Sequence, residues 1–220
     1  MNLTTGALRS LFVGGVDEAG RGPLAGPVTA ACVVLPPEFS NPAITDSKKL
    51  TESLRSSLYE EICQAAISYS VVSVGPRRID ILNIREATRV AMGLAVSRVA
   101  NELSERFGPK FFLHILIDGN MPIATNHSQE SIIKGDEKIL AISAASILAK
   151  VTRDRLMGNL ATKYQHYGFE VHKGYPTKGH IERIAAHGVC QVHRRSFRPV
   201  REHLSESSSR TRAGIRPDSV

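Results

Sequence analysis

The hydrophobic pattern of the chain alternates between short apolar runs and longer segments with helical periodicity. Short apolar runs, bounded by charged residues, glycine or proline, predict strands over residues 11–16, 27–35, 67–74 and 111–117. Apolar residues spaced three and four apart predict helices over residues 51–66, 79–107, 136 or 137 to 164, and 178–187. Strands that alternate with helices in this way favour an α/β domain.

Two local features refine this fold. The first two predicted strands lie close enough in sequence to form an antiparallel hairpin, so we expect a mixed sheet flanked by helices. Residues 141–149 are rich in small side chains, as expected where a helix packs closely on a sheet. We expect a main domain over residues 1–164, a helical C-terminal extension over 165–204, and a disordered, Ser-rich tail over 205–220.

Composition excludes several protein classes. The 220 residues are 42% hydrophobic and 22% charged, which suits a globular protein and excludes a collagen-like or wholly disordered chain. We find no apolar run long enough for a membrane span and no secretory signal pattern. Cys32, Cys63 and Cys190 are odd in number and far apart, so we expect no disulfide framework and a reducing, cytoplasmic location.

The positive charge is concentrated in one segment. Residues 148–203 contain 11 Lys and Arg against 4 Asp and Glu, and six of the eight histidines. A basic, His-rich segment favours a polyanionic partner such as nucleic acid. A solvated cationic surface that only aids solubility is an equal alternative.

Acidic residues occur where predicted strands end or a helix begins. Asp17 and Glu18 follow the first strand, Asp118 ends a later strand, and Asp136 precedes the small-residue helix. Such positions collect functional groups in α/β sheets. Carboxylates brought together there would repel one another, and their hard oxygen atoms suit Mg²⁺ or Mn²⁺.

Structural roles for these acids remain alternatives. Asp118 would also suit a turn with Gly119, and Asp136 would suit a helix N-cap. Neighbours in a strand face opposite ways, so Asp17 and Glu18 share one site only if the strand ends or bulges there.

Two further acid and metal patterns are weaker. Asp154 is a rival fourth carboxylate, but its position one turn after Lys150 favours an exposed ion pair. The spacing of His187, Cys190 and His193 resembles zinc ligation, but no fourth ligand is evident.

The segment Gly20-Arg21-Gly22 permits a backbone that approaches a ligand closely. It is not a dinucleotide-binding loop, because the next glycine, Gly26, comes one residue too late. The sequence contains no Walker loop, no H-E-x-x-H and no G-x-S-x-G.

The run VDEAGRGPLAGPV at residues 16–28 resembles the opening motif of ribonuclease HII, the type 2 ribonuclease H. Further matches follow in the same order: DSKKL at 46–50, NI at 83–84 with AT at 87–88 and AM at 91–92, DGN at 118–120, KGD at 134–136, AASILAKV at 144–151 with RD at 153–154, and GYPTKGH at 174–180. The resemblance covers residues 11–202 and is specific, because separate motifs agree in order and spacing.

The resemblance implies a ribonuclease H-like mixed sheet flanked by helices, with a substrate-binding C-terminal extension. It implies four metal-binding catalytic carboxylates, Asp17, Glu18, Asp118 and Asp136. The backbone of Gly20, Arg21 and Gly22 would contact the ribose 2′-hydroxyl, and Tyr175 would pack against the sugar of the adjoining deoxynucleotide.

The implied activity is cleavage of RNA in RNA–DNA hybrids, and at single ribonucleotides in duplex DNA, as in ribonucleotide excision repair. Cleavage on the 5′ side of the ribonucleotide would give 3′-hydroxyl and 5′-phosphate ends. Two divalent cations ~3.5–4 Å apart suit such hydrolysis, and four carboxylates can bind them. We expect a monomer with no membrane association.

Basic residues within or near these motifs are candidates for phosphate contacts, although some are expected to be only exposed charges: Lys48, Lys49, Lys150, Arg153, Lys173, Lys178 and His180. Two other functions stay open from the residues alone. One is a non-catalytic nucleic-acid-binding protein, and the other is a two-metal nuclease or phosphoryl transferase that ignores the 2′-hydroxyl.

Overall fold

The computed structural model describes residues 10–213, with side chains through residue 206. The chain forms two compact units. The first contains the chain up to Ala19, Thr29–Ser73 and Thr88–Thr152, and the second contains Gly20–Val28, Val74–Ala87 and the chain from Arg153 onward. This division differs from the boundary expected at residue 164, because two early segments join the C-terminal part of the chain.

The first unit is built on a five-stranded mixed sheet with the order β3-β2-β1-β4-β5. The strands are β1 (Ser10–Ala19), β2 (Val28–Val34), β3 (Ser68–Val74), β4 (Phe111–Asp118) and β5 (Ser128–Ile132). β1 is antiparallel to β2 and parallel to β4, and β4 is parallel to β5. The mixed sheet and the hairpin are confirmed. The sequence pattern missed β5, because four of its five residues are polar and none of them is buried.

The helices are α1 (Glu52–Ala65), α2 (Pro76–Leu82), α3 (Ile84–Phe107), α4 (Leu140–Lys163), α5 (Phe169–His172), α6 (Lys178–His187) and α7 (Arg198–Ala213), with the 3₁₀ turns η1 (Ser47–Lys49), η2 (Gly135–Glu137) and η3 (Gln165–Tyr167). The helix expected over 79–107 is divided at Asn83, which has a φ of 67°. Residues 205–213 are helical, in contrast to the expected disorder, and residues 214–220 lie outside the described chain. In the part of the chain that the structure describes, no helix is long and apolar enough to span a bilayer.

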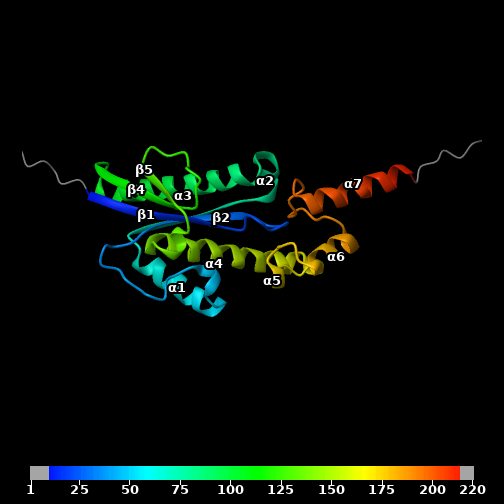
Figure 1. Ribbon diagram of the computed structural model, residues 1–220, viewed down its shortest axis with the longest axis horizontal. Coiled ribbons are helices and arrows are strands. Elements are labelled where there is room, and N and C mark those ends of the chain that lie inside the picture. The colour runs from blue at the N-terminus through cyan, green and yellow to red at the C-terminus, as the bar shows by residue number, and fades with distance from the viewer. Residues whose placement is uncertain (1–9, 214–220) are drawn as a thin grey trace, which may run out of the picture. The chain divides into compact units, whose positions relative to one another are not determined.

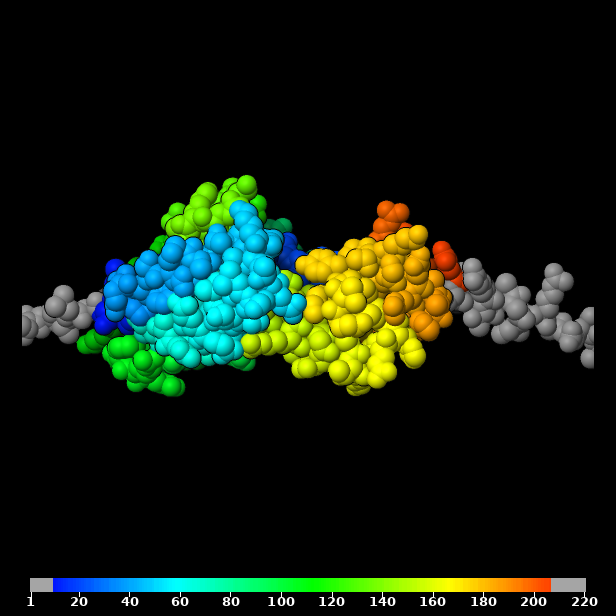
Figure 2. Space-filling model, turned by 90° about the horizontal axis from the view of Figure 1, so that it is seen from below, coloured from blue at the N-terminus to red at the C-terminus, as the bar shows by residue number. Residues whose placement is uncertain are grey.

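Helices cover both faces of the sheet in the first unit. Figure 1 shows α3 on one side and α1 with α4 on the other. On the α1 and α4 side, Ala31 and Val33 of β2 pack with Leu58 and Ile62 and with the small residues of α4. Figure 2 shows α1 in cyan and the chain that precedes it in blue on one surface of this unit.

Gly15 allows α4 to begin directly against β1. A Cβ atom at Gly15 would lie 2.1 Å from the carbonyl carbon of Ala141, so only glycine fits there. This backbone contact explains why the start of α4 is rich in small residues. It also fixes η2, which precedes α4 in the chain, near the C-terminal end of β1.

The second unit has its own apolar core. Leu24, Met157, Phe169, Ile184 and Val200 are buried together in this core. The segment Gly20–Val28 is therefore packed among residues that follow it by more than 100 positions.

Gly15→Val should lower the free energy of unfolding by about 3 kcal/mol or more, because the added side chain overlaps the Ala141 backbone. Gly158→Ala, in α4, is the matched control. Nothing lies within 4 Å of its added Cβ, so we expect a gain of about 0.5–1 kcal/mol. Urea denaturation measures both changes, and equal stability of the two variants would contradict the contact.

Candidate active site

Three carboxylates converge where β1 and β4 part from each other. The parallel pairing of these strands ends at Val16 and Ile117, so Asp17 and Asp118 are the next residues at the same edge. Asp136 comes from η2. Each of the three offers an oxygen atom, and these atoms all lie within 4.8 Å of one another.

Asp118 orients the segment that carries Asp136. Its Oδ1 accepts hydrogen bonds from the backbone N–H of Gly135 (2.7 Å) and of Asp136 (3.4 Å). A Cβ at Gly135 would lie 2.6 Å from Ile142 Cδ1, so this segment is tightly packed. Asp118 is therefore more than a turn residue. Asp136 lies inside η2, whose N-cap is Lys134, so it is not the N-cap of this turn.

The buried position of Asp17 disfavours its negative charge. The side chain is 4% exposed and accepts hydrogen bonds from the N–H of Glu18 (2.6 Å) and from the Ser146 hydroxyl. Burial, with the charges of Glu18 and Asp118, raises the pKa of Asp17 well above its usual value. Burial and the Asp118 charge also raise the pKa of Asp136, against the opposing effect of the Lys48 ammonium.

Glu18 lies on the other face of β1. The pairing with β2 continues without a bulge through Glu18 and Ala19, which pair with Ala30 and Thr29. Strand alternation therefore turns Glu18 away from the side that Asp17 occupies. Within the described chain, Glu18 does not belong to the carboxylate group, and its role as a metal ligand stays a prediction.

A serine pair behind Asp17 was not found from the sequence. Ser47 Oγ and Ser146 Oγ share a hydrogen bond of 2.8 Å in which either hydroxyl can be the donor, and Ser146 in turn lowers the pKa of Asp17 through a side-chain hydrogen bond. These serines are 99 positions apart in the sequence, so no local spacing relates them. The same segment places Lys48 Nζ 3.5 Å from Asp136 Oδ2 and Lys49 Nζ 2.9 Å from Glu137 Oε1.

The second unit contains the glycine loop and Tyr175. Gly20 has a φ of +90°, and a Cβ there would lie 1.9 Å from Arg153 Nε, so glycine is required. The ring of Tyr175 lies beside Gly22, 3.7 Å from the position of an added Cβ, and the residue is 41% exposed. A loop backbone and an exposed aromatic ring are therefore adjacent, and their contact with a sugar stays a prediction.

Sequence comparison identifies the family. The sequence model described as ribonuclease HII matches residues 14–200. The chain belongs to the ribonuclease HII family. It is a metal-dependent type 2 ribonuclease H, an endoribonuclease of RNA–DNA substrates.

Known members of the ribonuclease HII family are similar over most of their length. The ribonuclease HII of Bacillus cereus strain G9842 is 49% identical over 195 residues, which are 89% of this chain and 72% of that protein. The enzyme of Shewanella amazonensis is 50% identical over 196 residues, 89% of this chain and 91% of that protein. The crystal structure of ribonuclease H2 from Pyrococcus horikoshii OT3 has a TM-score of 0.68 at 27% identity and covers 89% of this chain and 98% of that one.

The buried positions of Arg153 and His180 contradict their expected phosphate contacts. Arg153 is 1% exposed and donates to the carbonyls of Pro27 and Ala25. His180 is 0% exposed, so it also lies in the interior. Both side chains donate hydrogen bonds to backbone carbonyls of the second unit. Asp154, expected in an exposed ion pair, is only 9% exposed.

Lys178 remains a surface cation. Its side chain is 91% exposed, and its Nζ lies 3.8 Å from Glu182 Oε1. It can therefore reach a phosphate, and its contact stays a prediction, as do those of Lys48, Lys49, Lys150 and Lys173.

Two histidines of the second unit form a buried chain that ends at Tyr175. His193 Nδ1 accepts from the Cys190 N–H, so its Nε2 carries the hydrogen and donates to His180 Nε2 at 3.1 Å. His180 Nδ1 then donates to the Tyr175 carbonyl at 2.9 Å. Burial lowers the pKa of both histidines to about 4. His187 instead stacks on His166, which does not favour the zinc alternative.

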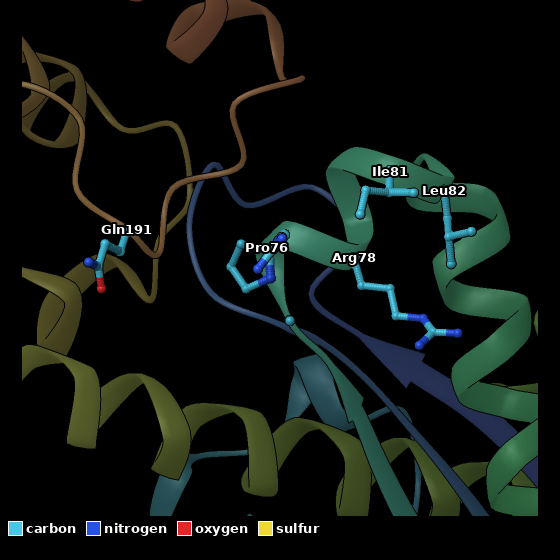
Figure 3. Close-up of a pocket in the computed structure, with 7 residues that line it drawn as sticks. Pro76, Arg78, Ile81, Leu82 and Gln191 are labelled. Carbon is cyan, nitrogen blue, oxygen red and sulfur yellow. The ribbon is translucent and has the colours of Figure 1, made fainter.

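A pocket of about 510 Å³ lies elsewhere in the second unit. Its lining residues come from α2 and the preceding Gly75, together with Gln191, as Figure 3 shows. None of the three clustered carboxylates lines it. The carboxylate group is therefore not part of this pocket.

The buried histidines should make the protein less stable in acid. Because their folded pKa of about 4 lies below the unfolded value, the unfolded state takes up protons first as the pH falls from 6.5 to 4. Each should lower the free energy of unfolding by up to about 1.4 kcal/mol per pH unit in this window. In His193→Gln, the free energy of unfolding should fall less steeply as the pH is lowered. Denaturation curves at several pH values measure this slope. Asp17 is present in both proteins, so its opposing effect on the pH dependence cancels in the comparison. Equal slopes of unfolding free energy against pH would contradict the buried hydrogen-bonded histidines.

Proposed function

We propose that this enzyme cleaves on the 5′ side of ribonucleotides, in RNA–DNA hybrids and at single ribonucleotides within duplex DNA, with 3′-hydroxyl and 5′-phosphate products. The convergence of Asp17, Asp118 and Asp136 carries this proposal, because a divalent cation relieves the repulsion among three carboxylates this close. Family membership supports the same reaction. We also propose a role in ribonucleotide repair, in the cytoplasm, as a monomer.

The donor set fits Mg²⁺ or Mn²⁺, since the three clustered side chains supply only hard oxygen ligands. Asp17, Asp118 and Asp136 would bind the metal, with Glu18 as the proposed fourth ligand. Two bound divalent ions would supply an activated water, neutralisation of the transition-state charge and stabilisation of the leaving 3′-oxygen. A ribonuclease HIII structure with Mn²⁺, at 18% identity and a TM-score of 0.65, has the same fold.

The chain prepares this site before any substrate binds. The Gly135 N–H orients the Asp118 carboxylate, and the Glu18 N–H with the Ser146 hydroxyl orients that of Asp17. The hydrogen bonds to Asp17 partly oppose the rise in its pKa that burial and the neighbouring charges cause. Lys48 and Lys49 are exposed, near Asp136 and Glu137, and would bind the phosphates that flank the scissile bond.

Selectivity for ribose would come from the glycine loop. The 2′-hydroxyl is the group that distinguishes RNA from DNA locally, so a selective enzyme must make polar contacts there. The loop around Gly22 offers backbone groups without a side chain in the way, and the adjacent Tyr175 ring would pack on the next sugar.

A labelled DNA duplex with one internal ribonucleotide tests this function directly. With Mg²⁺ or Mn²⁺ we expect a single nick on the 5′ side of the ribonucleotide, and with EDTA none, because the carboxylates alone cannot activate water. An all-DNA duplex of the same sequence is the control. Equal cutting of both duplexes would indicate a nuclease that ignores the 2′-hydroxyl, and no cutting with either metal would indicate a binding protein.

Asp17→Asn should lower turnover by at least about 10²-fold while largely sparing duplex affinity, since it removes a metal ligand. In EDTA the variant should be at least as stable as the wild type, because burial and neighbouring charges raise the Asp17 pKa and so disfavour its charged form. Glu130→Gln, at an acid of β5 outside the carboxylate group, is the control for both measurements. A destabilised Asp17→Asn would indicate a structural role instead.

A further inference from the structure

Arg194 is a buried cation whose hydrogen bonds go to the glycine loop. The residue is 0% exposed. Its Nη2 donates to the Gly20 carbonyl (2.6 Å), its Nη1 to the Arg21 carbonyl (2.8 Å), and its Nε to the Gly26 carbonyl (2.9 Å). Burial of a charge is costly unless hydrogen bonds compensate for it, so this arrangement depends on all three carbonyls.

The backbone around Arg194 is fixed from two sides. Its N–H donates to the Leu24 carbonyl at 2.7 Å. On the other side, the Asp80 carboxylate accepts from the N–H groups of Arg195 (3.0 Å) and Ser196 (2.9 Å). The guanidinium therefore starts from a fixed position and can orient the loop.

The bonds to Gly20 and Arg21 determine where the loop amides point. In a trans peptide the C=O and the following N–H are antiparallel. Because the carbonyls of Gly20 and Arg21 both point at Arg194, the N–H groups of Arg21 and Gly22 point away from it. Residues 21 and 22 are exposed, and successive amides with such an orientation form a site for an oxygen atom.

We propose that Arg194 is the positioning residue for ribose selectivity: it turns two peptide groups of the glycine loop so that their N–H groups face the 2′-hydroxyl of the substrate. It acts through the backbone and does not touch the substrate. The proposal rests on the proposed function, because it assumes that the loop contacts the ribose. Arg194 lies 168 or more positions after the loop, so sequence patterns did not indicate it.

Arg194→Lys keeps the charge but cannot reach three carbonyls in the same geometry. We would measure the affinity of wild type and variant, in EDTA to prevent cleavage, for two duplexes that differ by one 2′-hydroxyl. The ratio of the two dissociation constants should fall by about tenfold in the variant, as expected for the loss of about two oriented hydrogen bonds, while affinity for all-DNA duplex stays nearly constant. An unchanged ratio, or an equal loss of affinity for both duplexes, would overturn the proposal.

Arg183→Lys is the control. Arg183 also belongs to the second unit and donates to a backbone carbonyl, but to that of His166 (2.9 Å), which is not part of the glycine loop. Its substitution should leave the ratio of dissociation constants near that of the wild type. A similar fall in the ratio for both variants would indicate general loosening of this unit and would refute a specific role for Arg194.

The wild-type enzyme gives a test that does not depend on a variant folding. The amide resonances of Arg21 and Gly22 should shift more with the ribonucleotide-containing duplex than with the all-DNA duplex, and equal shifts would overturn the role. If the wild type cleaves and distinguishes the two duplexes, and Arg194→Lys distinguishes them equally well, only the role of Arg194 is refuted. A wild type that neither discriminates nor cleaves refutes the proposed function as well.

Discussion

Repulsion among three neighbouring carboxylates is the constraint on which this active site depends. Asp17, Asp118 and Asp136 have oxygen atoms within 4.8 Å of one another, although burial and mutual charge raise the pKa of Asp17 and of Asp136. The fold maintains this arrangement through strand pairing, through the close contact at Gly15, and through the amides that bind Asp118. Because the carboxylates repel one another without a cation, the site is well suited to bind one. The same repulsion lowers the stability of the folded protein at the place that function requires.

In the second unit two buried charges are positive instead of negative. Arg153 and Arg194 are buried cations, and backbone carbonyls accept their hydrogen bonds. A guanidinium has five N–H donors in a rigid plane, so it can fix several peptide groups at once. The carboxylates of the first unit thus provide a place for metal ions, whereas these arginines determine the shape of a loop. The positive charge of the C-terminal segment therefore does not all face nucleic acid.

This distinction explains which predicted phosphate contacts failed. Composition shows that the C-terminal segment is basic, but it cannot show which cations are exposed. Lys178 is exposed, whereas Arg153 and His180 lie in the interior. Arg153 donates to the carbonyls of Pro27 and Ala25, more than 120 positions earlier in the chain, and His180 bonds to His193, so these partners are known only once the chain is folded.

The sequence by itself determined most of the elements and the mixed sheet, because hydrophobic periodicity and the short β1–β2 connection are local properties. Its motifs also indicated Asp17, Asp118 and Asp136, since acids at strand ends are readable from the chain. Only the tertiary structure showed that Glu18 lies outside the group of three converging carboxylates, that the mostly polar β5 joins the sheet, and that Arg194 donates to carbonyls of the glycine loop. Each of these depends on register or on contacts between residues far apart in sequence, and such contacts form only when the whole chain packs.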